Sequence, residues 1–382
     1  MRRSPHVFAL GLCLGLAFAN AARVGIVVGL ACAALCAGAA FAAPAPGRPA
    51  VAAVALALLG WSWGSARLDA LERSALAARV GTAERARLVV TGPPRISRFD
   101  VRVPATVAAW GRLRLREPVL LKLPRGRAPP QGAIVELVGV LAAPGDFEKS
   151  WLRRRGVHVV VRSTTWRVVG RRGGLGGVAD RVRAHLARSV AVGLRGQRKA
   201  LLEGVVLGDD SRLSEGLRAR FRASGLYHLL AVSGQNVALV AGGALMLGWI
   251  AGVPRLVNEL GALAAIVAYV LAVGAQPSVV RAGVAGALGS LAWLTARARD
   301  RWYFLLLGAV ALLGWNPYTL LDPGFELSFA AVVSIFVLAP RFRRALEGYP
   351  MPEWCATSSR SPLPVAWQPH PSRGSTSTQS RS

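Results

Sequence analysis

The sequence is poor in acidic residues, lysine and histidine. Its 382 residues include 19 Asp+Glu and 5 His against 47 Lys+Arg, and only Lys122, Lys149 and Lys199 are lysines. The sequence also lacks a Walker loop, a nucleophile elbow, an HExxH zinc motif and any histidine-rich metal motif. We therefore expect no enzymatic activity, no cofactor and no bound metal.

Cysteine is scarce as well. Cys13, Cys32 and Cys36 lie in apolar runs, and Cys355 lies near the end of the chain. Cys32 and Cys36 are spaced like a pair of metal ligands, but no second Cys or His pair follows at ligand spacing. We expect buried apolar cysteines.

Long apolar runs are abundant. Hydrophobic residues make up 53% of the chain and charged residues 17%, against about 45–50% and about 25% in soluble domains. This excludes a disordered chain and argues against a wholly soluble one. Eight stretches are candidate membrane spans, at 7–20, 24–42, 50–64, 226–251, 256–275, 278–296, 302–315 and 325–340. The first also fits a cleavable signal peptide.

Residues 65–175 differ from the rest, with 22 Lys+Arg against 8 Asp+Glu and short β-rich runs divided by Gly and Pro. Five such runs predict a small barrel or sandwich, and an OB-type barrel has this strand count. The predicted fold class is an α-helical polytopic membrane protein with an inserted small all-β OB-like domain. The predicted strands are Ala86–Thr91, Phe99–Ala109, Arg112–Leu123, Gly132–Ala142 and Gly156–Val169.

The other boundaries follow from the apolar runs. Residues 1–64 hold N-terminal transmembrane helices, 176–225 an amphipathic interfacial segment, 226–345 further spans and 346–382 a disordered tail. Arginines in short loops alternate with the spans as the positive-inside rule requires, which predicts a multi-pass protein of the cytoplasmic membrane with the β domain outside. The net charge of +28 calls for a polyanionic neighbour, either anionic lipid headgroups or nucleic acid.

The densest polar motif is Ser224–Asn236, which runs directly into an apolar stretch. Polar groups at membrane depth are costly unless they are paired or solvated. His228, Ser233, Gln235 and Asn236 therefore either line a wet path or form a polar helix cap with a satisfied histidine.

Arg281 starts the sixth apolar stretch, and it either snorkels to the headgroups or faces a polyanion as a fixed cation. Asp322 and Glu326 lie four residues apart at the start of the eighth stretch. Stabilisation of acidic side chains by the dipole at a helix N-terminus explains this pair better than a catalytic role does.

Aromatic residues of the β domain are interleaved with arginines. The candidates for DNA binding are Trp110, Trp151, Arg153, Arg154 and Arg155. Aromatic rings in a basic groove stack the bases of single strands without regard to sequence. The alternative places the aromatics in the barrel core and leaves the arginines solvated.

Three passages resemble the N-terminal part of ComEC-type competence proteins, a family of DNA-internalisation channels. They are Ala143–Gly156; Leu202–Ser211 with Phe221–Val237; and Pro277–Ala282 with Asn316–Phe329. The first departs from the family pattern at Ala143, where Asn is usual. His228, Ser233, Gln235, Asn236 and Arg281 match characteristic positions, so the resemblance implies that they line the DNA path.

The resemblance implies uptake of single-stranded DNA during natural transformation. Implied partners are single-stranded DNA, an anionic membrane, a DNA receptor outside and a cytosolic motor or strand-binding protein. The metallo-β-lactamase-like domain common in the family is missing here, which indicates an N-terminal portion; an interrupted or frameshifted gene would account for an out-of-frame tail. The alternatives are a remnant that only inserts and binds DNA, and a transporter of another anionic solute.

Overall fold

The structure is a computed structural model, and it describes residues 4–97, 99–190, 192–208, 213–226, 234–274, 277–294 and 300–346. The chain divides into two compact units, Met1–Ser328 and Phe329–Ser382. The features below belong to the first unit unless stated.

All eight apolar stretches contain a helix. Among the described residues, three segments are long and apolar enough to cross a membrane, namely Arg48–Arg79, Arg255–Val273 and Pro323–Phe342, and five apolar helices are shorter. The membrane prediction is thus confirmed in part. The helices are α1 (Ser4–Phe18), α2 (Ile26–Ala42), α3 (Arg48–Glu72), α8 (Gly234–Ile250), α9 (Arg255–Val273), α10 (Pro277–Leu294), α11 (Arg301–Trp315) and α12 (Pro323–Leu346), which extends into the second unit.

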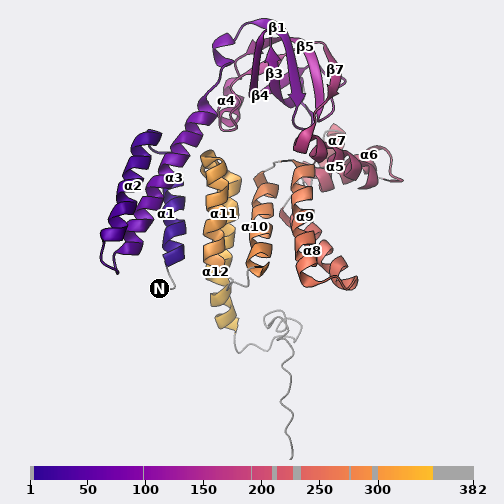
Figure 1. Cartoon of the computed structure of the whole chain (residues 1–382). Helices are drawn as coiled ribbons and strands as arrows, with labels where there is room; N and C mark the ends of the chain where they lie inside the picture. Colours follow the sequence, from indigo (N-terminus) through magenta and orange to yellow (C-terminus); the bar gives the residue numbers. More distant parts are fainter. Residues whose placement is uncertain are drawn as a thin grey trace, which may run out of the picture. The chain divides into compact units, whose positions relative to one another are not determined.

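The first three helices lie side by side (Figure 1). Glycines let α1 and α3 approach closely, because a Cβ at Gly15 would lie 1.9 Å from the Ala57 carbonyl oxygen, and one at Gly60 would lie 2.5 Å from that of Leu12. Small residues at such crossings are typical of helices packed in lipid. Any larger residue at Gly15 or Gly60 would force the two helices apart.

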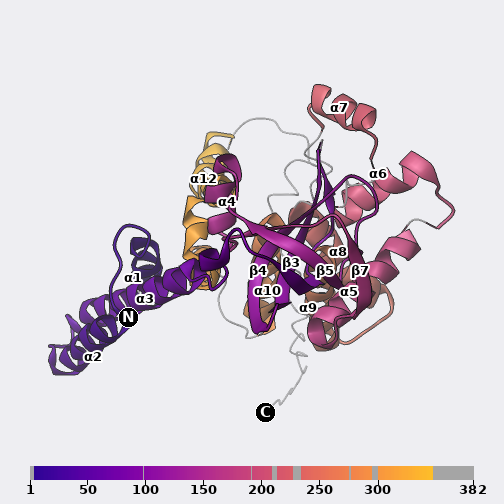
Figure 2. The same ribbon diagram turned by 90° about the horizontal axis from the view of Figure 1, so that it is seen from above.

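A five-stranded barrel follows α3 in sequence (Figure 2). Its strands are β1 (Ala83–Val90), β3 (Val101–Trp110), β4 (Leu113–Leu123), β5 (Ala133–Ala142) and β6 (Val160–Arg162). They pair in the order β1-β3-β4-β6-β5, and β5 pairs with β1 to close the ring. The β4–β6 pair is parallel and the others are antiparallel.

Alternating side chains fill this barrel, as the period of two in a strand requires. In β3, Val101, Val103, Ala105 and Val107 are buried and the residues between them are only partly buried. Trp110 is the largest fully buried side chain in the core. The first four predicted strands agree with β1, β3, β4 and β5 to within a few residues.

The fifth predicted strand, Gly156–Val169, is wrong as a single element. It is divided into β6 and β7 (Trp166–Arg171), which pair with successive parts of the same edge of β5. The Ser163 hydroxyl lies at this break, 2.7 Å from the Val138 carbonyl oxygen and 2.8 Å from that of Thr165, so its single proton is donated to one of the two or shared between them. The short strand β2 (Arg95–Ile96) pairs with β3, and α4 (Asp146–Arg153) connects β5 to β6.

The described residues of the predicted interfacial segment 176–225 form three helices, α5 (Gly174–Val190), which begins two residues before the segment, α6 (Gly196–Leu207) and α7 (Glu215–Ala223). Arg183 joins α5 to the end of α9, since its Nη1 donates to the carbonyl oxygens of Ala272 at 2.8 Å and Val273 at 3.0 Å. Short 3-10 helices follow α3, η1 (Ala77–Arg79), and α11, η3 (Pro317–Leu321).

Hydrogen bonds fasten the barrel to the end of α3. The buried carboxylate of Glu117 on β4 accepts from the Ser74 hydroxyl, from the Ala75 amide at 2.9 Å and from the Leu76 amide at 3.2 Å. His158 Nε2 lies 2.8 Å from the Leu71 carbonyl oxygen. The connection between α3 and the barrel is therefore a set of polar contacts.

We predict that Glu117→Gln destabilises the full chain by about 1–3 kcal/mol, because the amide presents donors to backbone donors and leaves buried groups unsatisfied. The measurement is thermal unfolding of the purified protein in detergent. Glu136→Gln is the matched control, since Glu136 pairs with the exposed Arg87 on the barrel surface. Equal melting temperatures for the two variants would contradict the role of Glu117.

Candidate nucleic-acid interface

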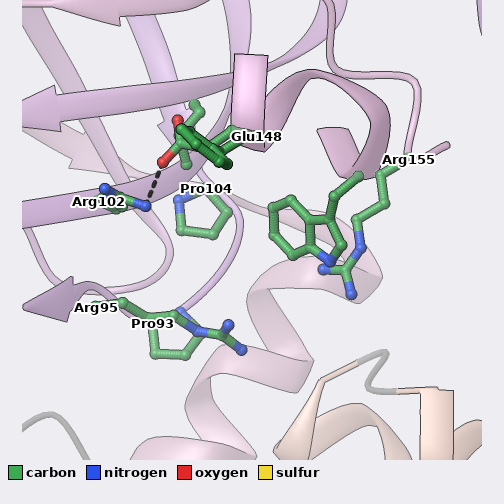
Figure 3. A pocket seen from close by; sticks show the side chains of 9 residues that line it. Pro93, Arg95, Arg102, Pro104, Glu148 and Arg155 are labelled. Carbon is green, nitrogen blue, oxygen red and sulfur yellow. Dashed lines mark ion pairs between the residues drawn. The ribbon is translucent and has the colours of Figure 1, made fainter. Parts of the chain in front are cut away.

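One side of the barrel carries a basic, aromatic groove with a cavity of about 360 Å³. Three parts of the barrel form it: the β1–β3 connection, the adjoining faces of β3 and β4, and the β5–β6 connection with α4. Figure 3 shows Arg95, Arg102 and Arg155 around this groove. Its lining is Pro93, Arg95, Arg102, Pro104, Leu120, Phe147, Glu148, Trp151 and Arg155.

The helix α4 presents the aromatic residues of the groove. Leu152 is buried against Leu120 and Val160, which anchors one face of the helix to the barrel. Phe147 and Trp151 are four residues apart and share another face. Phe147 is fully exposed and Trp151 is 46% exposed. Exposed rings on an anchored helix are a suitable surface for planar ligands.

Acidic residues neutralise some of the cations here. Arg102 Nε lies 3.0 Å from Asp100 Oδ1, and the Arg102 guanidinium also pairs with Glu148. The second oxygen of Glu148 lies 2.8 Å from Lys122 Nζ. Arg102 and Lys122 are therefore held by carboxylates of the barrel itself.

Arg155 is held differently, because its guanidinium lies over the indole of Trp151 with 4.1 Å between Cζ and the ring centroid. Burial lowers the pKa of Arg155, and the nearby charge of Arg95 lowers it further, whereas Asp322 acts in the opposite direction. An arginine stays charged in any case. The groove thus contains a cation stacked on an aromatic ring, with its N–H edge available to an anion.

The structure gives the five DNA-binding candidates different environments. Trp110 is fully buried in the barrel core, so its ring packs among apolar side chains and is closed to a base. The three consecutive arginines point to different partners. Arg153 lies 3.3 Å from Glu72, and Arg154 donates to the Leu321 carbonyl oxygen at 2.8 Å. Of the three, Arg155 lines the groove together with Trp151.

The prediction from sequence did not select Arg95, Arg102 or the two prolines as site residues. They lie far from Trp151 in the chain, and only closure of the barrel brings the β1–β3 and β5–β6 connections together. The available signal was the pair of breaks at Gly92-Pro93-Pro94 and Pro144-Gly145, which mark both connections.

Among the channel candidates, His228 and Ser233 lie outside the described residues. Gln235 is exposed at the start of α8. Asn236 Nδ2 donates to the Val205 carbonyl oxygen at 2.9 Å, and the Tyr269 hydroxyl donates to that of Val206 at 2.7 Å. Asn236 therefore caps the last turn of α6, whatever else it contacts.

Arg281 is mostly buried, with 13% of its side chain exposed. Its Nη1 lies 3.7 Å from Asp322 Oδ2, and a Cβ on Gly324 would lie 3.2 Å from its Nη2. Glu326 is exposed one turn beyond Asp322. In the part of the chain that the structure describes, no group of three His, Cys, Asp or Glu could hold a metal.

The described residues thus combine apolar helices, three of them long enough to cross a membrane, with a β-barrel that has a groove lined by arginine and aromatic side chains. A family model described as competence protein matches residues 205–368. The chain is 29% identical to ComE operon protein 3 of Bacillus subtilis (strain 168) over 147 residues, which is 38% of this chain and 19% of that protein. It is also 29% identical to competence protein ComA of Neisseria gonorrhoeae over 214 residues, 52% of this chain and 30% of that protein.

These matches confirm the resemblance to ComEC-type competence proteins. The matched regions span less than a third of either relative. No solved structure matches the chain.

We predict that Asn236→Ala with Tyr269→Phe loosens α6, because two carbonyl oxygens at its end lose their donors at about 0.5–1.5 kcal/mol each. Trypsin should then cleave at Arg195 or Lys199 at least several-fold faster in the full chain. Asn258→Ala is the control, since Asn258 donates to Leu245 and joins α8 to α9 without touching α6. Unchanged cleavage in the double variant would show that these contacts do not hold α6.

Proposed function

We propose that this chain is a membrane-embedded component of DNA uptake, and that the groove of the barrel receives single-stranded DNA. The observation that carries the proposal is the groove itself, where Arg155 stacks on Trp151 beside the exposed ring of Phe147. Backbone neutralisation by arginine and base stacking on aromatic rings are the two contributions that single-strand binders combine.

The barrel topology supports an OB-type assignment and the position of this groove. In OB folds, oligonucleotides bind on the face of the second and third strands and at the loops between strands one and two and between strands four and five. The corresponding parts here are β3 with β4, the β1–β3 connection and the β5–β6 connection. These are the three parts that line the groove.

The eight apolar helices support a multi-pass protein of the cytoplasmic membrane with the barrel on the outer side. The short-loop arginines agree with this orientation under the positive-inside rule, and a long basic domain translocates largely regardless of its charge. In this arrangement the chain binds and guides the strand without catalysing a reaction, and a cytosolic partner supplies the energy for import. The competence-family matches support the same assignment.

We predict that Arg155→Gln weakens binding of oligo-dT by the full chain in nanodiscs and reduces the log–log salt slope by about 0.7, the share of one neutralised phosphate on a single strand. Trp151→Ala should weaken binding by about 1–3 kcal/mol with little change in slope, because it removes stacking. The control is Arg167→Gln, which removes an equal charge from β7, outside the groove. The proposed groove is wrong if Arg155→Gln and Arg167→Gln give the same slope and affinity.

The orientation can be tested separately. Reporter fusions after Arg172 and after Arg344 should place the barrel outside and the end of α12 in the cytoplasm, because the loop arginines alternate in this way. A phosphatase reporter should be active at the first site and a fluorescent cytosolic reporter at the second. A cytoplasmic signal after Arg172 would reverse the proposed direction of transport.

A further inference from the structure

We propose that Asp322 is a displaceable counter-ion that covers Arg281, and that phosphates of an incoming strand replace its carboxylate. This rests on the proposed function, and it assigns to Asp322 the control of access to the cation. A carboxylate and a guanidinium can pair for stability alone. In this pair, however, Arg281 keeps donors without a partner, and one oxygen of Asp322 is bound elsewhere.

The Arg281 guanidinium has N–H groups that Asp322 does not bind. Its Nη1 lies 3.7 Å from Asp322 Oδ2, beyond the range of about 2.7–3.2 Å for an N–H···O hydrogen bond. Both Nε and Nη1 are buried without a hydrogen-bond partner among the described residues. An arginine fork paired with a carboxylate or phosphate normally makes two parallel hydrogen bonds. Arg281 is thus attracted to Asp322 but is not saturated by it.

Asp322 also interacts only weakly with Arg281, because part of its carboxylate is bound elsewhere. Its Oδ1 accepts a hydrogen bond from the Gly324 amide at 3.1 Å, so the start of α12 holds one carboxylate oxygen. The missing side chain of Gly324 lets the guanidinium lie against the backbone, because a Cβ there would come within 3.2 Å of Nη2. The carboxylate can keep its bond to Gly324 when another anion takes the guanidinium.

The pair lies next to the groove of the barrel. The carbonyl oxygen of Leu321, one residue before Asp322, accepts a hydrogen bond from Arg154 at 2.8 Å. The Asn316 side chain in turn donates to the Arg154 carbonyl oxygen at 3.0 Å. Arg154 precedes Arg155, which lines the groove. A strand that leaves the groove along Arg155 would therefore reach Asp322 and Arg281 next.

The Asp322 carboxylate competes with any incoming anion for Arg281, so only an anion that binds more strongly can displace it. A monovalent anion gains no more from Arg281 than Asp322 does, whereas a polyanion adds contacts with neighbouring arginines and can displace it. Removal of the Asp322 charge should therefore raise the affinity for polyphosphates, and the increase should require Arg281.

The experiment is a double-mutant cycle on the full chain in nanodiscs, with Asp322→Asn, Arg281→Gln and the double variant. Asn keeps the oxygen that accepts from Gly324 and loses only the charge. Two probes are titrated at a fixed salt concentration: tripolyphosphate, which has no bases to stack, and a dT oligonucleotide. Asp69→Asn is the control for net charge, since Asp69 pairs with Arg23 at 2.9 Å in a different ion pair.

We expect Asp322→Asn to bind tripolyphosphate about three- to tenfold more tightly than the wild type, and Asp69→Asn to bind it unchanged. The gain should disappear in the Arg281→Gln background. A gain that persists without Arg281, or no gain at all, would overturn the counter-ion role. If coupling is seen with tripolyphosphate but the wild type does not bind dT, the counter-ion stands and the proposed DNA function fails.

Discussion

The carboxylate of Glu72, at the end of α3, is the contact on which the placement of the candidate site depends. It lies 2.7 Å from Arg23 of the α1–α2 connection, accepts from the Tyr318 hydroxyl of η3 at 2.5 Å and lies 3.3 Å from Arg153 of α4. Three separate segments thus converge on one acidic side chain of α3. An exposed ion pair contributes little by itself, but a shared acceptor with a bidentate arginine gives geometric specificity.

These contacts at Glu72 also determine which segment lies next to the groove. Arg153 binds Glu72 while the next residue, Arg154, binds η3 through Leu321, so α4 is held against the connection that leads to α12. Trp63 of α3 strengthens the same region, since its indole donates to the Gly314 carbonyl oxygen at 2.9 Å. The groove of the barrel and the Arg281–Asp322 pair are therefore neighbours because polar contacts of α4 hold the residues that adjoin both.

Periodicity predicted the elements well, because period two and long apolar runs are properties of neighbouring residues. Predicting the apolar helices and the first four strands required no knowledge of the tertiary structure. At the break, the Ser163 hydroxyl contacts the backbone of β5, and hydropathy does not record such a contact. Likewise, Trp110 and Trp151 both have arginines close by in the sequence, and only barrel closure decides that one is core and the other surface.

The site was harder to predict, because charge density alone does not distinguish the tasks of arginines. Arg153, Arg154 and Arg155 form a single basic run in sequence, yet they bind a carboxylate, a carbonyl oxygen and an indole ring. The few acidic residues determine which arginines are bound within the protein and which are not. Glu72 and Glu117 hold the junction, and Glu148 covers Arg102 and Lys122. In a chain with 19 acids and 47 basic residues, the position of each acid determines which cations remain available to a polyanion.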